Sequence, residues 1–142
     1  MLILPQKLRP LTGYRFLIVE DEILQAHRVG DLIVEMGGEV AKIVYGFEQA
    51  RTAIADTAFD CAILDINLNG TLSFRLAESL KRQDIPFIFC TAYAEAADVY
   101  PDASDTPRVD KPVRPAELRD ALLLVLHLRH GADTGSRPIR IP

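Results

Sequence analysis

Short apolar segments recur five times along the chain, and this recurrence constrains the fold more than any other feature. Each segment has the length and composition of a buried strand, and helical patterns separate most of them. The segments are residues 14–19, 39–45, 61–64, 86–90 and 108–110. Strands that alternate with helices predict a parallel sheet covered on both faces, and right-handed crossovers make that sheet doubly wound. We therefore expect an α/β domain that is a three-layer sandwich.

The helical patterns define the rest of the domain. The first has apolar residues at positions 29, 32, 33 and 36 and ends at Gly37 and Gly38. Others are expected at about 47–57, 72–82 and 115–130. Between residues 94 and 107 the pattern lapses, so we expect the fourth helix to be short or missing. We expect one domain at 14–130, an N-terminal extension at 1–13 outside its core, and a flexible C-terminal tail at 131–142.

The composition excludes several classes of function. The net charge of −4 argues against bulk nucleic-acid binding, which needs a basic field. No apolar run reaches membrane-spanning length, and the apolar opening stops at Pro5, too early for a secretory signal, so we expect a cytoplasmic protein. Cys61 and Cys90 lie in apolar strand segments without ligand-spaced partners. Buried free thiols are therefore favoured over a disulfide or a metal site.

Polar side chains follow four of the five strands, where a parallel sheet gathers its strand ends at one edge. These residues are Glu20, Asp21, Asp65, Thr91 and Lys111. The first strand is followed by three acids in succession, Glu20, Asp21 and Glu22. Adjacent like charges repel each other, and a cation is the usual way to hold them close. Each residue also has an ordinary structural explanation. Asp65 suits a turn or cap, Thr91 a strand-end hydroxyl, and Lys111 a solvated charge.

Four short motifs lie at these strand ends: Val-Glu-Asp-Glu at 19–22, Leu-Asp-Ile-Asn at 64–67, Thr-Ala-Tyr at 91–93 and Asp-Lys-Pro at 110–112. In this order they resemble the motif set of the response-regulator receiver domains of two-component signalling, over residues 14–130. The resemblance implies the flavodoxin-like (βα)5 form of the predicted fold. It also implies phosphorelay signal transduction, in which the domain catalyses only its own phosphorylation and dephosphorylation.

The resemblance implies a role for each residue of the set. Asp65 would accept a phosphoryl group from the phosphohistidine of a histidine kinase or histidine phosphotransfer protein. Asp21 and Asp65 would bind Mg²⁺ directly, Glu20 through water, and Asn67 through its backbone carbonyl. Lys111 would pair with Asp65 and later with the phosphoryl oxygens, to which Thr91 would also donate. Ala92 would leave room for the phosphodonor, and Tyr93 would be the switch aromatic. The loop at about 91–106 would be the element with two arrangements that phosphorylation biases.

Two departures from the common receiver pattern stand out. The loop between Asp65 and Gly70 is short and lacks the usual Met-Pro pair, although it retains Asn67, and it bears on how fast water reaches the phosphoryl group. The fourth helix is weak. In both features the chain resembles a group of receivers that have an Asp-Ile-Asn-Leu loop and a degenerate fourth helix.

The chain shows no output domain after residue 130, so we expect an unidentified downstream protein to read the phosphorylated state. The last helix is apolar around most of its circumference because it also carries Leu123, Leu124, Leu126 and Leu128. We favour a homodimer or partner contact there over cover by the N-terminal extension. A free-standing regulator, a phosphate sink and a fragment of a longer protein all fit this pattern.

Two other classes of protein compete with this interpretation. Phosphatases of the haloacid-dehalogenase type also use a strand-end Asp nucleophile with Mg²⁺, but they need a second Asp two positions later, where this chain has Asn67. A pseudo-receiver would keep the fold as a binding module that works without phosphate. The intact set of Asp21, Asp65, Thr91 and Lys111 argues against that alternative.

Overall fold

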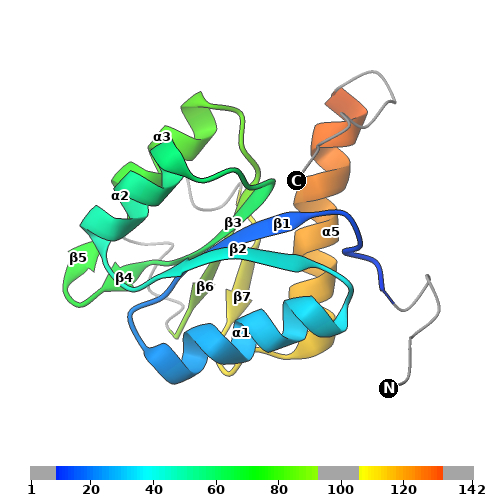
Figure 1. Cartoon of the computed structure of the whole chain (residues 1–142), viewed down its shortest axis with the longest axis horizontal. Coiled ribbons are helices and arrows are strands. Elements are labelled where there is room, and N and C mark those ends of the chain that lie inside the picture. The colour runs from blue at the N-terminus through cyan, green and yellow to red at the C-terminus, as the bar shows by residue number, and fades with distance from the viewer. Residues whose placement is uncertain (1–8, 93–105, 133–142) are drawn as a thin grey trace.

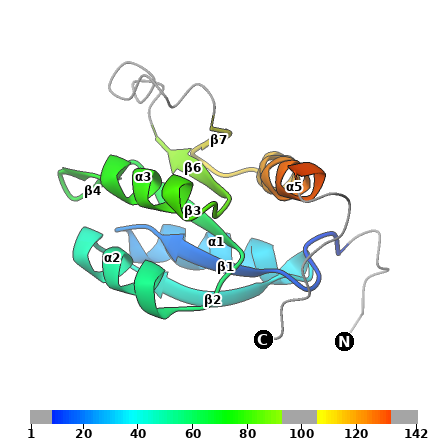
Figure 2. The same ribbon diagram turned by 90° about the horizontal axis from the view of Figure 1, so that it is seen from above.

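A five-stranded parallel sheet forms the centre of the protein, in a computed structural model that describes residues 9–92 and 106–132. The strand order is β2-β1-β3-β6-β7, which Figure 2 shows from one end of the sheet to the other. The strands are β1 (Arg15–Val19), β2 (Glu39–Val44), β3 (Cys61–Asp65), β6 (Phe87–Thr91) and β7 (Arg108–Asp110). This order confirms the predicted doubly wound, flavodoxin-like fold.

Helices cover both faces of the sheet. They are α1 (Ile23–Glu35), α2 (Phe47–Asp56), α3 (Phe74–Arg82) and α5 (Pro115–Ala132). One apolar cluster joins α2 and α3 to one face through Leu17, Leu64 and Phe89, and a second joins α1 and α5 to the other face through Ile18 and Ile63. Figure 1 shows α2 and α3 together on one side of the sheet. The alternation of neighbouring strand residues between the two clusters creates the three layers.

The expectation that residues 1–13 lie outside the core is wrong for Leu11. This side chain is fully buried in the cluster of α1 and α5. Its backbone N–H donates to the carbonyl of Met36 at 3.0 Å, and the N–H of Glu39 donates to the carbonyl of Tyr14 at 3.0 Å. These bonds hold residues 9–14 against the turn between α1 and β2, a contact between segments that no local pattern reveals.

A small hairpin follows β3, and its last residue lies in the segment 72–82 for which a helix was predicted. Strands β4 (Asn67–Leu68) and β5 (Thr71–Leu72) pair antiparallel around Asn69 and Gly70. Both turn residues have positive φ, 51° and 91°, as a two-residue type I′ turn requires. Because the hairpin uses Thr71 and Leu72, α3 begins only at Phe74.

The additional leucines of α5 were expected to form a homodimer or partner contact, but not all of them reach the surface. Leu126 is buried in the core, Leu123 packs partly against it, and Leu124 is 51% exposed. The side chain of Leu128, the expected fourth helix at 94–107 and Tyr93 fall largely or wholly outside the described residues. In the part of the chain that is described, no helix combines the length and apolar character needed to cross a membrane.

Candidate functional site

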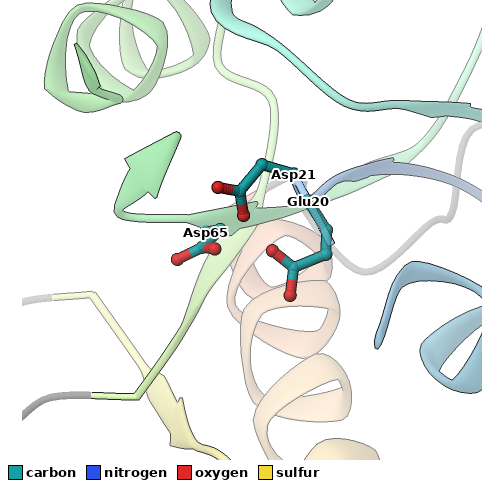
Figure 3. Close-up of side chains that lie close together, drawn as sticks. All are labelled: Glu20, Asp21 and Asp65. Carbon is teal, nitrogen blue, oxygen red and sulfur yellow. The ribbon is translucent and has the colours of Figure 1, made fainter. Parts of the chain in front are cut away.

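The strand register brings three acids together at one edge of the sheet. Val19 pairs with Leu64, so Glu20 and Asp21 follow β1 beside Asp65 at the end of β3. One carboxylate oxygen from each of Glu20, Asp21 and Asp65 lies within 4.8 Å of the other two. Figure 3 shows the three carboxylates gathered at this edge. We call these three residues the carboxylate cluster.

Lys111 reaches the carboxylate cluster from the end of β7. Its Nζ lies 3.2 Å from Oδ2 of Asp65, the ion pair that the sequence analysis expected. It also donates to Oε1 of Glu20, a contact that was not expected. The side chains of Lys111, Glu20 and Asp65 are only 12%, 6% and 9% exposed. One ammonium group therefore forms ion pairs with two buried carboxyl groups.

Burial and crowding change the acid–base properties of this group of side chains. Burial, followed by the hydrogen bond and the charge shared with Asp65, raises the pKa of Glu20 to about 8 against the opposing effect of Lys111. Burial alone would lower the pKa of Lys111, but the hydrogen bond with Glu20 and the charge of Asp65 raise it overall. The cluster therefore favours a bound positive charge.

The β4–β5 hairpin lines the site through its backbone. The N–H of Asn69 donates to Oδ2 of Asp21 at 3.0 Å, and the N–H of Asn67 donates to Oδ1 of Asp65 at 3.4 Å. The side-chain oxygen of Asn67 accepts from the N–H of Gly70 at 2.7 Å. The contact of Asn69 was not predicted from the sequence, although the Asn-Gly pair is the strongest short signal for a hairpin.

Thr91 ends β6 next to the site. Asp65 pairs with Cys90 in the sheet register, and Thr91 pairs with Asp110. The residue is 4% exposed, and its carbonyl accepts from the N–H of Lys111 at 2.9 Å. Thr91 and Lys111 are thus tied together by their backbones at the edge where Asp65 ends β3. Tyr93, the expected switch aromatic, lies outside the described residues.

The donor set fits a hard divalent cation such as Mg²⁺. All the side-chain donors of the cluster are carboxylate oxygens, the ligands that Mg²⁺ prefers. Oε2 of Glu20 is buried and has no hydrogen-bond partner among the residues described. An orphaned buried oxygen among like charges is unfavourable unless a cation or water satisfies it. Glu20, Asp21 and Asp65 are the residues that would hold the ion.

The cysteines take no part in this cluster. Both are free and buried, as expected. Burial raises the pKa of Cys90 to about 12 and also raises the pKa of Cys61. Their thiols stay protonated near neutral pH and behave as apolar core groups.

Comparisons with known proteins agree with this geometry. The family model of the response regulator receiver domain matches residues 16–123. The phosphate regulon transcriptional regulatory protein PhoB of Pseudomonas aeruginosa is 31% identical over 137 residues, which cover 92% of this chain and 59% of that protein. The chain spans 59% of the length of PhoB and 44% of the length of the positive alginate biosynthesis regulatory protein of the same organism, which is 33% identical over 110 residues.

Solved structures agree on the fold. The PhyR response regulator REC domain of Erythrobacter litoralis superposes with a TM-score of 0.76 at 26% identity, covering 93% of this chain and 99% of that one. SdrG from Sphingomonas melonis Fr1 gives a TM-score of 0.72 at 33% identity, covering 80% and 96%. The family match spans most of the chain, and the strand-end motifs fall inside it. The chain therefore belongs to the family of response-regulator receiver domains.

Proposed function

We propose that the protein accepts a phosphoryl group on Asp65 from the phosphohistidine of a histidine kinase or histidine phosphotransfer protein, with Mg²⁺, and so carries a phosphorelay signal. The observation that carries the proposal is that the buried carboxylate of Asp65 lies within 3.2 Å of the ammonium group of Lys111 and within 4.8 Å of two further carboxylates. Family membership supports a signalling role rather than that of a conventional enzyme.

The reaction forms one bond and breaks another. An oxygen of Asp65 attacks the phosphorus, the P–N bond to the donor imidazole breaks, and its electron pair leaves with the imidazole nitrogen. The product is an acyl phosphate. Lys111 gives up its contact with Asp65 and donates to the new phosphoryl oxygens, and the hydroxyl of Thr91 donates to another.

Mg²⁺, when bound, would supply a second positive charge that offsets the charge of the transferring group. Asp21 and Asp65 would hold it directly, Glu20 through water and Asn67 through its carbonyl. The hydrogen bond from Asn69 to Asp21 supports this assignment, because it fixes the direction of that carboxylate.

The phosphorylated state would then be read by a downstream protein. Phosphorylation adds close to two negative charges and biases an element with two arrangements, which we assign to the segment 91–106 with Tyr93 as its switch. We further propose a receiver unit at 14–130 that acts in the cytoplasm. Leu124 on α5 would take part in a homodimer contact, because this apolar side chain is 51% exposed.

Phosphorylation by acetyl phosphate with Mg²⁺ tests the proposal. We expect the protein and the Asp56→Asn control, which alters an exposed carboxylate, to gain one phosphoryl group. Asp65→Asn should gain none, and persistent labelling of that variant would refute the assignment.

Two outcomes would support the competing classes instead. Multiple turnovers on small phosphate esters would favour a phosphatase. Asn67 counts against that class because it carries no acidic proton and its side-chain oxygen accepts a hydrogen bond within the hairpin. Failure of the folded protein to bind beryllofluoride with Mg²⁺ would favour a pseudo-receiver.

A further inference from the structure

Helices α2 and α3 lie side by side on one face of the sheet (Figure 1). Residues of both helices line a groove of about 350 Å³. No residue of the carboxylate cluster lines this groove. Its floor is apolar: Ile54 and Leu76 are 7% and 2% exposed, and Phe47 is half-buried beside them. Such a floor is suited to receive an apolar side chain from another molecule.

Three arginines line the same groove, Arg51 from α2 and Arg75 and Arg82 from α3. We call them the arginine rim. The one acid among the lining residues, Glu48, pairs with Arg51 at 2.6 Å. The side chains of Arg75 and Arg82 are exposed and form no ion pair or hydrogen bond with any residue in the described ranges. Three positive charges less one negative charge leave the groove at +2, although the whole chain carries −4.

The spacing of the arginine rim selects the shape of its ligand. Arg75 and Arg82 are seven positions apart on one face of α3, with Ser79 between them along the groove. Seven residues of helix rise about 10 Å along the groove. Acidic residues seven apart on a second helix have the same spacing. The groove also follows α2 over seven positions, from Phe47 to Ile54.

We propose that the groove between α2 and α3 binds an acidic amphipathic helix of a partner protein. An apolar side chain of that helix packs on Ile54 and Leu76, and its carboxylates pair with Arg75 and Arg82. The charge of the groove, opposite to that of the whole chain, favours an acidic partner and disfavours a second copy of this acidic chain. This surface is separate from the phosphoacceptor site, so its test does not depend on phosphorylation.

A designed peptide provides the probe. A fluorescein-labelled helix of about 18 residues carries Glu at i and i+7 with Leu at i+3 and i+4 between them. Fluorescence anisotropy measures its Kd for the full chain and for Arg75→Glu/Arg82→Glu. The matched control is Arg114→Glu/Arg119→Glu, an equal change of charge at exposed arginines near the start of α5. Circular dichroism checks that both variants fold.

We expect the groove variant to weaken binding roughly tenfold or more and the control to change it less than about twofold. A peptide with Lys in place of Glu should bind the groove variant better than the native chain. Equal loss in both variants, or none in either, would overturn the proposal. Displacement of the peptide by inorganic pyrophosphate, at the same concentration of negative charge as the peptide, would assign the groove to small anions. That result would overturn the proposal. Self-association that the groove variant abolishes would assign it to a second copy, with the same consequence.

Discussion

Lys111 shows at the scale of single residues how the site is held together. Its ammonium group contacts both Glu20 and Asp65, and all three side chains are largely buried. Removing charges from water is unfavourable, and among the described residues Lys111 is the one cation that contacts these two carboxyl groups. With its pKa raised to about 8, Glu20 holds a proton near pH 7 when no metal ion is bound, so the ion pair with Asp65 is the main interaction that Lys111 supplies. The free energy of the fold near the site therefore depends strongly on this one residue.

We predict that Lys111→Met, which keeps the volume but removes the charge, lowers the free energy of unfolding by about 3 kcal/mol without Mg²⁺. The variant leaves the buried carboxylate of Asp65 without a cation, beside a Glu20 that holds its proton. Lys42→Met, on the exposed side of β2, serves as the control and should change it by less than about 0.5 kcal/mol. Urea unfolding with EDTA measures both, and equal stabilities would contradict the buried ion pair.

The free energy of unfolding should also depend on pH through Cys61, which is not part of the site. Burial, and then the charge of Asp60, raise the pKa of its thiol above the ordinary 9.0. Because the folded pKa is the higher one, the contribution to stability is complete below pH 9.0 and is lost as the pH rises beyond it. The native chain should lose up to about 1.4 kcal/mol per pH unit more than Cys61→Ala above that pH. Parallel pH profiles in urea unfolding would contradict the burial of the thiol.

The residues of the site could be named from the sequence, but not all of their contacts. Strand ends and motif order were enough to select Glu20, Asp21, Asp65 and Lys111, because parallel strands end at one edge. The bond between Lys111 and Glu20 could not be predicted, since it depends on how far one flexible side chain extends. The resemblance gave Glu20 a metal-binding role only.

Among the elements, the sheet strands and the helices of the described part were predicted to within a few residues, because long periodic segments carry strong signals. The β4–β5 hairpin was not predicted, since strands of two residues are too short to show alternation. Leu11 was assigned to the wrong environment because its partners on α1 and α5 are distant in sequence. Short elements and nonlocal packing were the parts that local patterns missed.

Gly37 and Gly70 have nearly the same backbone conformation but different surroundings. Substituting each therefore distinguishes the cost of backbone strain from the cost of a steric clash. Gly70 in the hairpin has φ of +91° and open space where a Cβ would lie, whereas Gly37 has φ of +89° and would bring a Cβ to 2.5 Å from Thr12 Oγ1. We predict that Gly70→Ala lowers the free energy of unfolding by about 1 kcal/mol, the cost of a left-handed alanine. Gly37→Ala should lower it by at least about 1 kcal/mol more, because the segment at 9–13 must also shift.

Urea unfolding of both variants measures these differences. Gly46→Ala is the control, since Gly46 has neither positive φ nor a neighbour within 4 Å of the added carbon. Equal effects of Gly37→Ala and Gly70→Ala would show that residues 9–13 do not pack against the turn after α1.

Across the whole molecule, the site lies where four of the five sheet strands end. Strands β1, β3 and β6 contribute to both apolar clusters, and β7 contributes Val109 to the cluster of α1 and α5. A ligand bound across their ends therefore binds the folded chain and not the unfolded one. Such a ligand must raise the stability of the entire domain.

We predict that Mg²⁺ at about 100 times its Kd raises the free energy of unfolding by about 2.7 kcal/mol, as linkage requires. Asp21→Asn should abolish most of this gain because it removes a direct ligand. Asp31→Asn, an exposed carboxylate on α1, should retain the gain. Calorimetric titration supplies the Kd and thermal unfolding the stability. A gain that survives in Asp21→Asn would contradict the proposed metal site.

The most direct test of the account identifies the carboxylate that carries the phosphoryl group. The chain is phosphorylated with acetyl phosphate and Mg²⁺, the acyl phosphate is reduced with borohydride, and the peptide spanning 52–75 is sequenced by mass spectrometry. We expect Asp65 alone to be converted to homoserine, and only when Mg²⁺ is present. Conversion of Asp56 or Asp60 in the same peptide, or conversion of Asp65 in EDTA, would contradict the account.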